Sequence, residues 1–463
     1  MNLIHRLPHR LRGCLHTILL CSLAASANAV ADTSSALTRI SGADAIASRT
    51  LANGLQIIVW PDEDIPNVAW YHWVKVGSRN ERPGITGISH FFEHMMFQGT
   101  SERASGEFDR VMEAGGGVNN AYTSNDVTVY TDWFPRSALE LIFEIESDRF
   151  ANLSFDPETV ESERGVILSE RRSTVDDRNM WYLAEQMQAV AFVAHPYQIP
   201  IIGWPSDIAA WTLEDLQTHF RVNYAPNNTV LVVVGAVTPD EVFEKAEQYF
   251  GKIPAQPAPA EVRTVEPEQQ GQRRIELRRP GQTAFVQAVF HIPPADDPAM
   301  PALKLLVDIL ATGSSSRLYQ RLIEQEQSAI EVDAYVEENL DPGLLWFMTV
   351  LPGDGDPASV EAALFAELER ITDQGVTAAE LDKARNIQLA AFWRQLATID
   401  GKADLLGTYE VFHGDYRKLF AAPSAYQAVT TEDIKALAAR ILKVSNSTVG
   451  TLVPARADQE AGS

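Results

Sequence analysis

Apolar residues recur along the chain with two different spacings. Residues 55–60 and 68–76 form short apolar runs rich in β-branched and aromatic side chains, which is typical of strands. Residues 87–98 carry apolar side chains three and four positions apart, which predicts a helix. Segments of both kinds alternate from about residue 48 to 250, and the apolar run 229–237 indicates a central strand of this unit.

A proline-rich segment separates this unit from a second one of similar character. Residues 251–272 hold four prolines and little periodic pattern, so we interpret them as a linker, and the second unit runs from residue 273 to about 454. Each unit contains a helix start that leads to a strand, and the two copies stand about 218 residues apart. The matching segments are Thr212-Leu213-Glu214-Asp215 with Asn227-Asn228-Thr229-Val230, and Thr430-Thr431-Glu432-Asp433 with Asn446-Ser447-Thr448-Val449. This similarity predicts a tandem duplication of one α+β unit, and chance similarity of two short segments is the alternative.

The first 29 residues have the pattern of a secretory signal. Three arginines precede the apolar run 15–25, and Ala27-Asn28-Ala29 fits a cleavage site, so the mature chain would begin near Val30 in the periplasm or outside the cell. Both cysteines of the sequence, Cys14 and Cys21, lie in this segment. We therefore expect neither a disulfide nor cysteine-based catalysis in the mature chain.

Two other fates of this segment are open. Cys21 could carry a lipid, although the bulky Leu20 before it fits lipid attachment poorly, and the segment could remain as an uncleaved anchor, although its apolar run is short for a span. No other part of the sequence has 18 uninterrupted apolar residues, so we expect no membrane span in the mature chain.

Charge and length limit the function classes. With 38 Lys and Arg against 62 Asp and Glu, the formal net charge is −24, which argues against nucleic acid as a partner because few cations remain to neutralise phosphates. A chain of 463 residues also exceeds one hydrophobic core of ordinary size, in agreement with two domains.

The predicted helix 87–98 carries the pattern His-x-x-Glu-His. His90, Glu93 and His94 share one helical face, because residues three and four apart are neighbours on a helix. Two imidazoles one turn apart can bind one Zn²⁺, and the glutamate between them then lies beside the metal. We therefore predict a zinc site, with one metal ion per chain.

A catalytic zinc ion commonly takes three protein ligands, so a third must come from elsewhere. The acidic segment 161–170 offers Glu163 and Glu170, which lie two helical turns apart on one face. The residues alone do not choose between them, and by composition such a segment is more often a solvated helix.

The chain resembles the pitrilysin/insulinase family of zinc metallopeptidases, the inverted zincins. The likeness is strongest to its short-chain branch, which includes mitochondrial processing peptidase and bacterial two-subunit relatives. Beyond the metal motif, the segments that carry the resemblance are Gly115-Gly116-Gly117-Val118-Asn119-Asn120-Ala121-Tyr122-Thr123, His195-Pro196-Tyr197 with Gly203 and Asp207, and Asn223-Tyr224-Ala225-Pro226-Asn227-Asn228.

The resemblance implies a fold with two tandem homologous α+β domains, each a mainly antiparallel sheet covered by helices. The expected boundaries are a signal peptide at 1–29, the zinc-binding catalytic domain at 30–250, the linker at 251–272, a homologous domain without metal at 273–455, and a tail at 456–463.

The resemblance also assigns roles in the site. The family's third ligand falls on Glu170, 76 residues after His94, and its second acidic residue falls on Glu163, which would orient a ligand; a plain surface salt bridge is the alternative for Glu163. Glu93 would take the proton of the attacking water. Asn120 and Ala121 match positions that pair with an extended substrate, although an ordinary strand after a glycine-rich turn would look the same.

The second half departs from the family's complete pattern. Residues 302–311 stand where the first half has its metal helix and contain neither His nor Glu, and Ile323 and Ile330 occupy the positions of a substrate-binding Arg and Tyr. We therefore expect a related partner subunit that supplies this pair, in a heterodimer or heterotetramer, unless Arg317 or Arg321 substitutes.

The sequence thus predicts a zinc endopeptidase subunit that cuts extended or unstructured peptides. A non-catalytic scaffold or assembly subunit of the same family is the main alternative, and the intact metal motif argues against it. A zinc hydrolase of another fold is disfavoured because the matching segments are spread along the chain.

Overall fold

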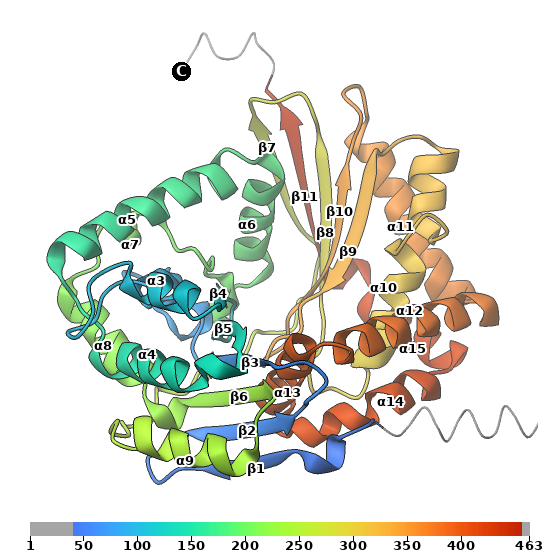
Figure 1. Ribbon diagram of the computed structural model, residues 1–463. Coiled ribbons are helices and arrows are strands. Elements are labelled where there is room, and N and C mark those ends of the chain that lie inside the picture. Colours follow the sequence, from blue (N-terminus) through green and yellow to red (C-terminus); the bar gives the residue numbers. More distant parts are fainter. Residues whose placement is uncertain (1–39, 456–463) are drawn as a thin grey trace, which may run out of the picture.

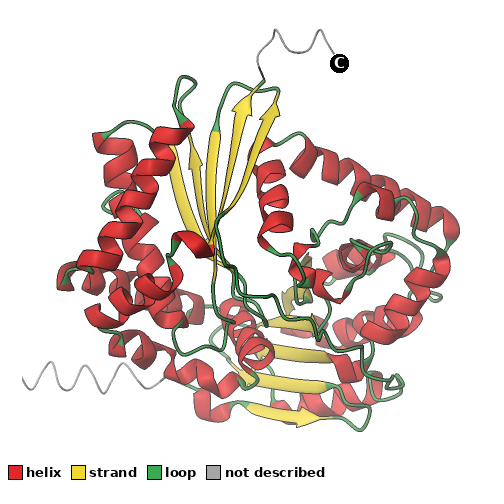
Figure 2. Ribbon diagram, turned by 180° about the vertical axis from the view of Figure 1, so that it is seen from behind, coloured by secondary structure: helices red, strands yellow, loops and turns green. Residues whose placement is uncertain are grey.

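The structure, a computed structural model, describes residues 40–455, so the predicted signal segment and the tail 456–463 lie outside the described residues. Two β-sheets stand at an angle to one another, and helices cover their faces (Figures 1 and 2). The predicted α+β fold is confirmed. None of the helices within the described range is both long and apolar enough to cross a membrane.

The first sheet has six strands in the order β1-β2-β6-β3-β5-β4. Strands β2 and β6 run parallel, and all other neighbours are antiparallel. The bounds are β1 Ala47–Thr50, β2 Gln56–Pro61, β3 Asn67–Val74, β4 Val118–Thr123, β5 Thr128–Pro135 and β6 Thr229–Gly235. The helices of this half are α2 Ile88–Met95, α3 Glu107–Ala114, α4 Leu139–Asn152, α5 Pro157–Arg171, α6 Asn179–Ala191, α7 Pro205–Ile208, α8 Leu213–Asn223 and α9 Pro239–Tyr249.

The second sheet has five strands in the order β7-β11-β8-β10-β9, and β7 and β11 form its parallel pair. The bounds are β7 Arg273–Arg279, β8 Phe285–His291, β9 Glu331–Val336, β10 Leu344–Val350 and β11 Ser447–Pro454. The helices are α10 Met300–Ala311, α11 Pro357–Gln374, α12 Ala378–Leu396, α13 Ile399–His413, α14 Ala422–Ala428 and α15 Thr431–Ile441.

The two halves repeat one topology. The order β2-β6-β3-β5-β4 corresponds strand for strand to β7-β11-β8-β10-β9, and the matching helix starts are the capping boxes of Thr212 and Thr430. In each box the backbone amide of an aspartate three residues on donates to the threonine hydroxyl, and the threonine amide donates to the carboxylate of that aspartate, so two amides at the helix start have partners. The predicted tandem duplication is confirmed.

Each half also covers one face of the other half's sheet. Helix α13 packs with Ile399, Ala403 and Leu406 against the first sheet, where Gly407 lies directly on the indole of Trp73. Helix α6 packs in the same way against the second sheet, with Leu183 and other apolar residues (Figure 1). The predicted domain boundaries 30–250 and 273–455 divide the sequence but do not separate two independent cores, because a helix of each half packs against the sheet of the other.

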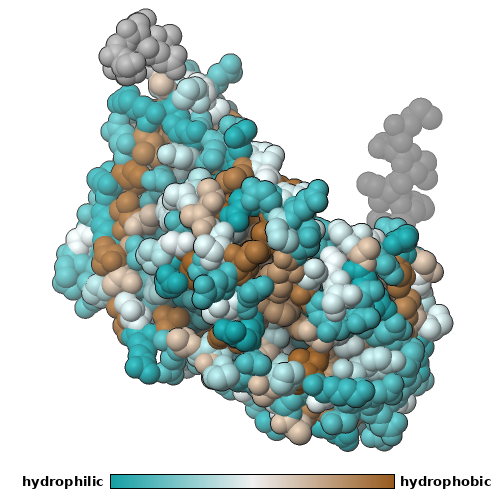
Figure 3. Space-filling view, turned by 90° about the vertical axis from the view of Figure 1, so that its left-hand side faces the viewer, coloured by the Kyte–Doolittle hydropathy of each residue, from teal (hydrophilic) through white to brown (hydrophobic). Residues whose placement is uncertain are grey.

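The molecular surface is mostly polar on the face seen in Figure 3. Apolar side chains lie in smaller patches between the hydrophilic ones. Among the large hydrophobic side chains exposed within the described residues are Val118 and Tyr122 on β4, and Ile330 just before β9.

Candidate metal centre

Helix α2 has a buried apolar face and a polar face. Phe91, Phe92 and Met95 pack into the core of the first half, and the spacing of three and four places His90 and His94 together on another face. The hydroxyl of Tyr130 on β5 donates to the carbonyl of Phe92 at 2.9 Å, which ties the helix to the sheet.

The start of α2 is held by a buried carboxylate. Glu81, 6% exposed, accepts from the backbone amides of Gly87 at 2.6 Å and Ser89 at 2.8 Å. Burial raises the pKa of Glu81 to about 8, although these amide bonds lower it. The amides at the start of α2 therefore have partners before any metal is considered.

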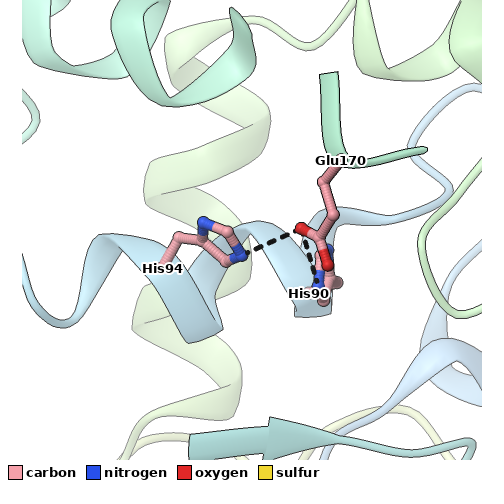
Figure 4. A group of neighbouring side chains, drawn as sticks. All are labelled: His90, His94 and Glu170. Atoms are coloured by element: carbon pink, nitrogen blue, oxygen red, sulfur yellow. Dashed lines mark ion pairs between the residues drawn. The ribbon is translucent and has the colours of Figure 1, made fainter. Parts of the chain in front are cut away.

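The structure brings His90, His94 and Glu170 together from α2 and α5 (Figure 4). One ligand atom of each lies within 4.8 Å of the others. Within residues 40–455, this is the group of three or more His, Cys, Asp or Glu side chains that lie close enough together to hold a metal ion. Glu170 Oε2 is 3.4 Å from His94 Nε2 and 3.7 Å from His90 Nε2. Atoms about 2.1 Å from one tetrahedral zinc ion lie about 3.4 Å apart, so the three residues fit zinc.

The charges around the two imidazoles also favour a cation. Burial lowers the pKa of His90 to about 4. Burial would lower the pKa of His94 too, but the carboxylates of Glu163 and Glu170 raise it to about 9. The pKa of Glu170 is lowered, first by its hydrogen bond with His94. A cation at this place would therefore meet the carboxylate of Glu170 and two nitrogen ligands.

Glu93 lies beside this group on the same helix. The hydroxyl of Thr123, at the end of β4, donates to Glu93 Oε2 at 2.7 Å. Burial raises the pKa of Glu93, and the bond from Thr123 lowers it. The carboxylate is thus held in one orientation in surroundings that make it a better proton acceptor.

Glu163 lies next to His94 and not at the meeting point of the three candidate ligands. Its Oε2 is 3.5 Å from His94 Nδ1, and its Oε1 accepts from Gln98 Nε2 at 2.8 Å. The side chain therefore faces the ring nitrogen of His94 opposite to the one near Glu170, which is where a carboxylate would fix the tautomer of a metal ligand.

Thr123 and Gln98 are site residues that the sequence did not reveal. Gln98 lies four residues after His94 and within the predicted helix 87–98, so its spacing was a usable signal, although α2 itself ends at Met95. Thr123 ends the glycine-rich segment that carried the resemblance, but only the pairing of β4 with β5 places it against α2.

Asn120 and Ala121 lie on β4, which forms one edge of the first sheet and pairs with β5. Ala121 faces Tyr130 across the pair, and the same strand ends at Thr123 beside Glu93. The free edge of β4 therefore runs toward the histidine group.

The second half contains no equivalent ligands in α10. The polar residues of this helix are Lys304, which pairs with Glu338 at 2.6 Å, and Asp308, which accepts from Gln388 at 2.8 Å. Within residues 40–455, the group of metal-binding residue types that meet comes from the first half.

The residues considered for substrate binding lie in and near the π-helix Tyr319–Gln325. Ile323 packs partly against the second core, and Ile330 is 62% exposed. Arg317 is bound by Glu380 at 2.7 and 2.9 Å, and Arg321 pairs with Glu326 at 2.9 Å.

Comparisons with known proteins agree with this architecture. A family model described as Insulinase (Peptidase family M16) matches residues 61–204, and one described as Peptidase M16 inactive domain matches residues 210–388. The zinc protease PqqE of Helicobacter pylori is 30% identical over 414 residues, which cover 88% of this chain and 92% of that protein. The uncharacterized zinc protease YmxG of Bacillus subtilis is 24% identical over 85% of this chain and 94% of its own length.

Solved structures show the same fold. The crystal structure of a protease from Helicobacter pylori has a TM-score of 0.86 and 29% identity, and covers 88% of this chain and 99% of that chain. The periplasmic protease PqqL from Escherichia coli has a TM-score of 0.74 at 21% identity, with 89% of this chain matching 48% of that chain.

The repeated fold and these relatives define a peptidase family. The chain belongs to the insulinase, or pitrilysin, family of M16 peptidases. The resemblance noted from the sequence is confirmed, and the inactive-domain match covers much of the half whose α10 carries no His or Glu.

Proposed function

We propose that this chain is a zinc-dependent endopeptidase subunit that hydrolyses extended or unstructured peptides. The observation that carries the proposal is the meeting of His90, His94 and Glu170 from two helices, with Glu93 beside them. A scaffold subunit would have no need of this arrangement. The names of the zinc protease relatives support the same activity.

His90, His94 and Glu170 would hold one zinc ion, and Glu163 would orient His94. Zinc in such a site polarises a carbonyl group and lowers the pKa of water. Glu93, held by Thr123, would accept a proton from the attacking water at its carboxylate and then donate it to the leaving amine.

The substrate would add a strand to the free edge of β4 at Asn120 and Ala121. Backbone hydrogen bonds would then give affinity without selecting one sequence, because every extended peptide offers the same amides and carbonyls. The strand would run toward Thr123 and so bring the scissile bond to Glu93.

A related subunit would complete the site. Neither the side chain of Ile323 nor that of Ile330 can donate a hydrogen bond, and Arg317 and Arg321 are each engaged with a carboxylate. We propose that the partner supplies an Arg and a Tyr, in a heterodimer or in a heterotetramer of two such pairs. The signal-like segment 1–29 and the periplasmic relative PqqL support a location in the periplasm.

The test combines metal content with activity. Glu93→Gln should keep one zinc per chain and lose nearly all cleavage of an unstructured peptide, because an amide cannot accept the proton. Glu170→Gln should bind zinc more weakly, because a neutral amide replaces an anionic ligand. Cleavage by Glu93→Gln at the wild-type rate, or purified wild-type chains that retain no zinc, would exclude the proposed mechanism.

A further inference from the structure

Arg171 follows Glu170 at the end of α5 and is buried, with 4% of its side chain exposed. Its guanidinium forms a bidentate pair with Glu185, with both N–O distances at 2.8 Å. The same group donates to the backbone carbonyl of Gly203 at 2.8 Å. The backbone next to Glu170 is therefore fixed by three charge-assisted hydrogen bonds.

Gly203 in turn lies against the start of α2. A Cβ atom on Gly203 would come within 2.4 Å of the Thr86 carbonyl oxygen and 2.5 Å of Gly87 Cα. A Cβ on Gly87 would meet Ile202 and Gly203 as closely, and both glycines have positive φ angles, 82° and 83°. The two backbones can cross this closely because neither residue has a side chain.

Glu185 connects the same guanidinium to the second half of the chain. It lies on α6 between Leu183 and Met187, which pack against the second sheet. Arg171, at the end of α5, thus connects this helix to the start of α2 through Gly203 and to α6 through Glu185.

Glu170 needs such support because little else fixes it. Its side chain is 35% exposed, and the side-chain atoms within 4 Å of its carboxylate that form ion pairs belong to His90 and His94. The distance between the carboxylate and the two imidazoles therefore depends on how α5 lies relative to α2.

We propose that Arg171 is a positioning residue for the metal site, which sets the distance of Glu170 from His90 and His94 through Gly203 and Glu185. The proposal rests on the proposed function, since it takes these three residues as the zinc ligands. It also gives the second half a role in metal binding, because α6, which carries Glu185, packs against the second sheet.

The test compares Arg171→Met with a matched control, Arg317→Met. Arg317 forms the same kind of contact within the second half: a bidentate pair with Glu380 and a hydrogen bond to the carbonyl of Gly375 at 3.1 Å. Both variants lose a largely shielded guanidinium that pairs with a carboxylate, since 4% of the Arg171 side chain and 11% of the Arg317 side chain are exposed. A general loss of stability should therefore appear in both.

Zinc affinity is measured by competition with a chelator, and coordination by the visible absorption spectrum of the Co²⁺-loaded protein. We expect Arg171→Met to bind zinc about 10- to 100-fold more weakly and to change the cobalt spectrum, as for other residues that orient ligands. Arg317→Met should keep the wild-type affinity and spectrum. Arg171→Lys should recover part of the affinity, because an ammonium group cannot make the bidentate pair.

The proposal is overturned if folded Arg171→Met and Arg317→Met match the wild type in affinity and in cobalt spectrum. If Glu170→Gln weakens zinc binding and Arg171→Met does not, the ligand set stands and only the positioning role is wrong. If neither variant changes the affinity, the third ligand lies elsewhere and both ideas fail. Should Arg171→Met not fold, Glu185→Gln replaces it, with the same expected direction and the same refuting result.

Discussion

Replacing Thr123 by valine tests whether the hydrogen bond from Thr123 orients Glu93 as the proton acceptor. Valine has nearly the shape of threonine and is compatible with a strand, so β4 and its pairing with β5 should persist. The change removes the hydroxyl that donates to Glu93 Oε2 at 2.7 Å and leaves the candidate ligands untouched. Burial, which raises the pKa of Glu93, then acts without the opposing bond.

The size of the effect follows from that hydrogen bond. A hydrogen bond to a charged group contributes about 1.5–3 kcal/mol. Each 1.36 kcal/mol of transition-state stabilisation corresponds to a tenfold rate, so a loss of this size lowers kcat/KM about 10- to 100-fold. The loss stays below that of Glu93→Gln, because the proton acceptor itself remains.

The assay is steady-state cleavage of an unstructured peptide by the complete assembly, with zinc content measured on the same samples. Thr123→Ser is the control, because serine keeps the hydroxyl, and it should retain activity near the wild type. If Thr123→Val, with full zinc, cleaves as fast as Thr123→Ser, the hydroxyl does not orient the base. If Thr123→Val loses zinc, its effect acts on the metal site and the reasoning from Glu93 is wrong.

Two other predictions concern the partner and the packing of the halves. Mixing this chain with the proposed partner subunit should raise peptidase activity far above the sum of the separate chains; ordinary turnover by this chain alone at low concentration would refute the need for a partner. Burial raises the pKa of Asp404 on α13 to about 6, while its bond from Gln395 lowers it. The folded state therefore keeps a proton that the unfolded chain releases near pH 4, so this contribution to stability is present below pH 4 and is lost as pH rises to about 6. Asp404→Asn should accordingly gain about 1–2 kcal/mol over the wild type in urea unfolding at pH 7 and nothing near pH 4, and an equal gain at both pH values would contradict the assignment.

The parts that the sequence predicts are those set by local spacing. His90, Glu93 and His94 share a helical face because of the helical repeat, and the structure keeps them on one face of α2. The capping boxes of Thr212 and Thr430 are equally local, and they identified the duplication that the strand order confirms.

The choice between Glu163 and Glu170 shows where spacing fails. Both lie on one face of α5, so helical periodicity treats them alike. They differ only in how α5 crosses α2, which places Glu170 near Nε2 of His94 and Glu163 near Nδ1. Gly203 accepts from Arg171 of α5 and contacts Gly87 at the start of α2, a contact that spans more than a hundred residues of sequence.

The hydrophobic pattern of the sequence also does not show that α6 and α13 each cover the sheet of the other half. The apolar residues of α6 and α13 predict that each helix is buried, but periodicity does not say against which sheet. Trp73 and Gly407 lie in different halves and far apart in the sequence, so no local signal joins them.

This exchange of helices connects the second half to the candidate metal site. The first sheet has apolar residues on both faces, and α13 of the second half covers the face that includes Ile58 and Val232. Without the second half those side chains would be exposed to water, at a cost of about 25 cal/mol for each Å² of apolar surface. The second half in turn needs α6, which follows α5 and holds the Glu185 that binds Arg171 beside Glu170. The contacts that bury the two sheets are therefore continuous with the contact that fixes the third candidate ligand, so changes that loosen the packing of the halves should reach the metal site through Arg171.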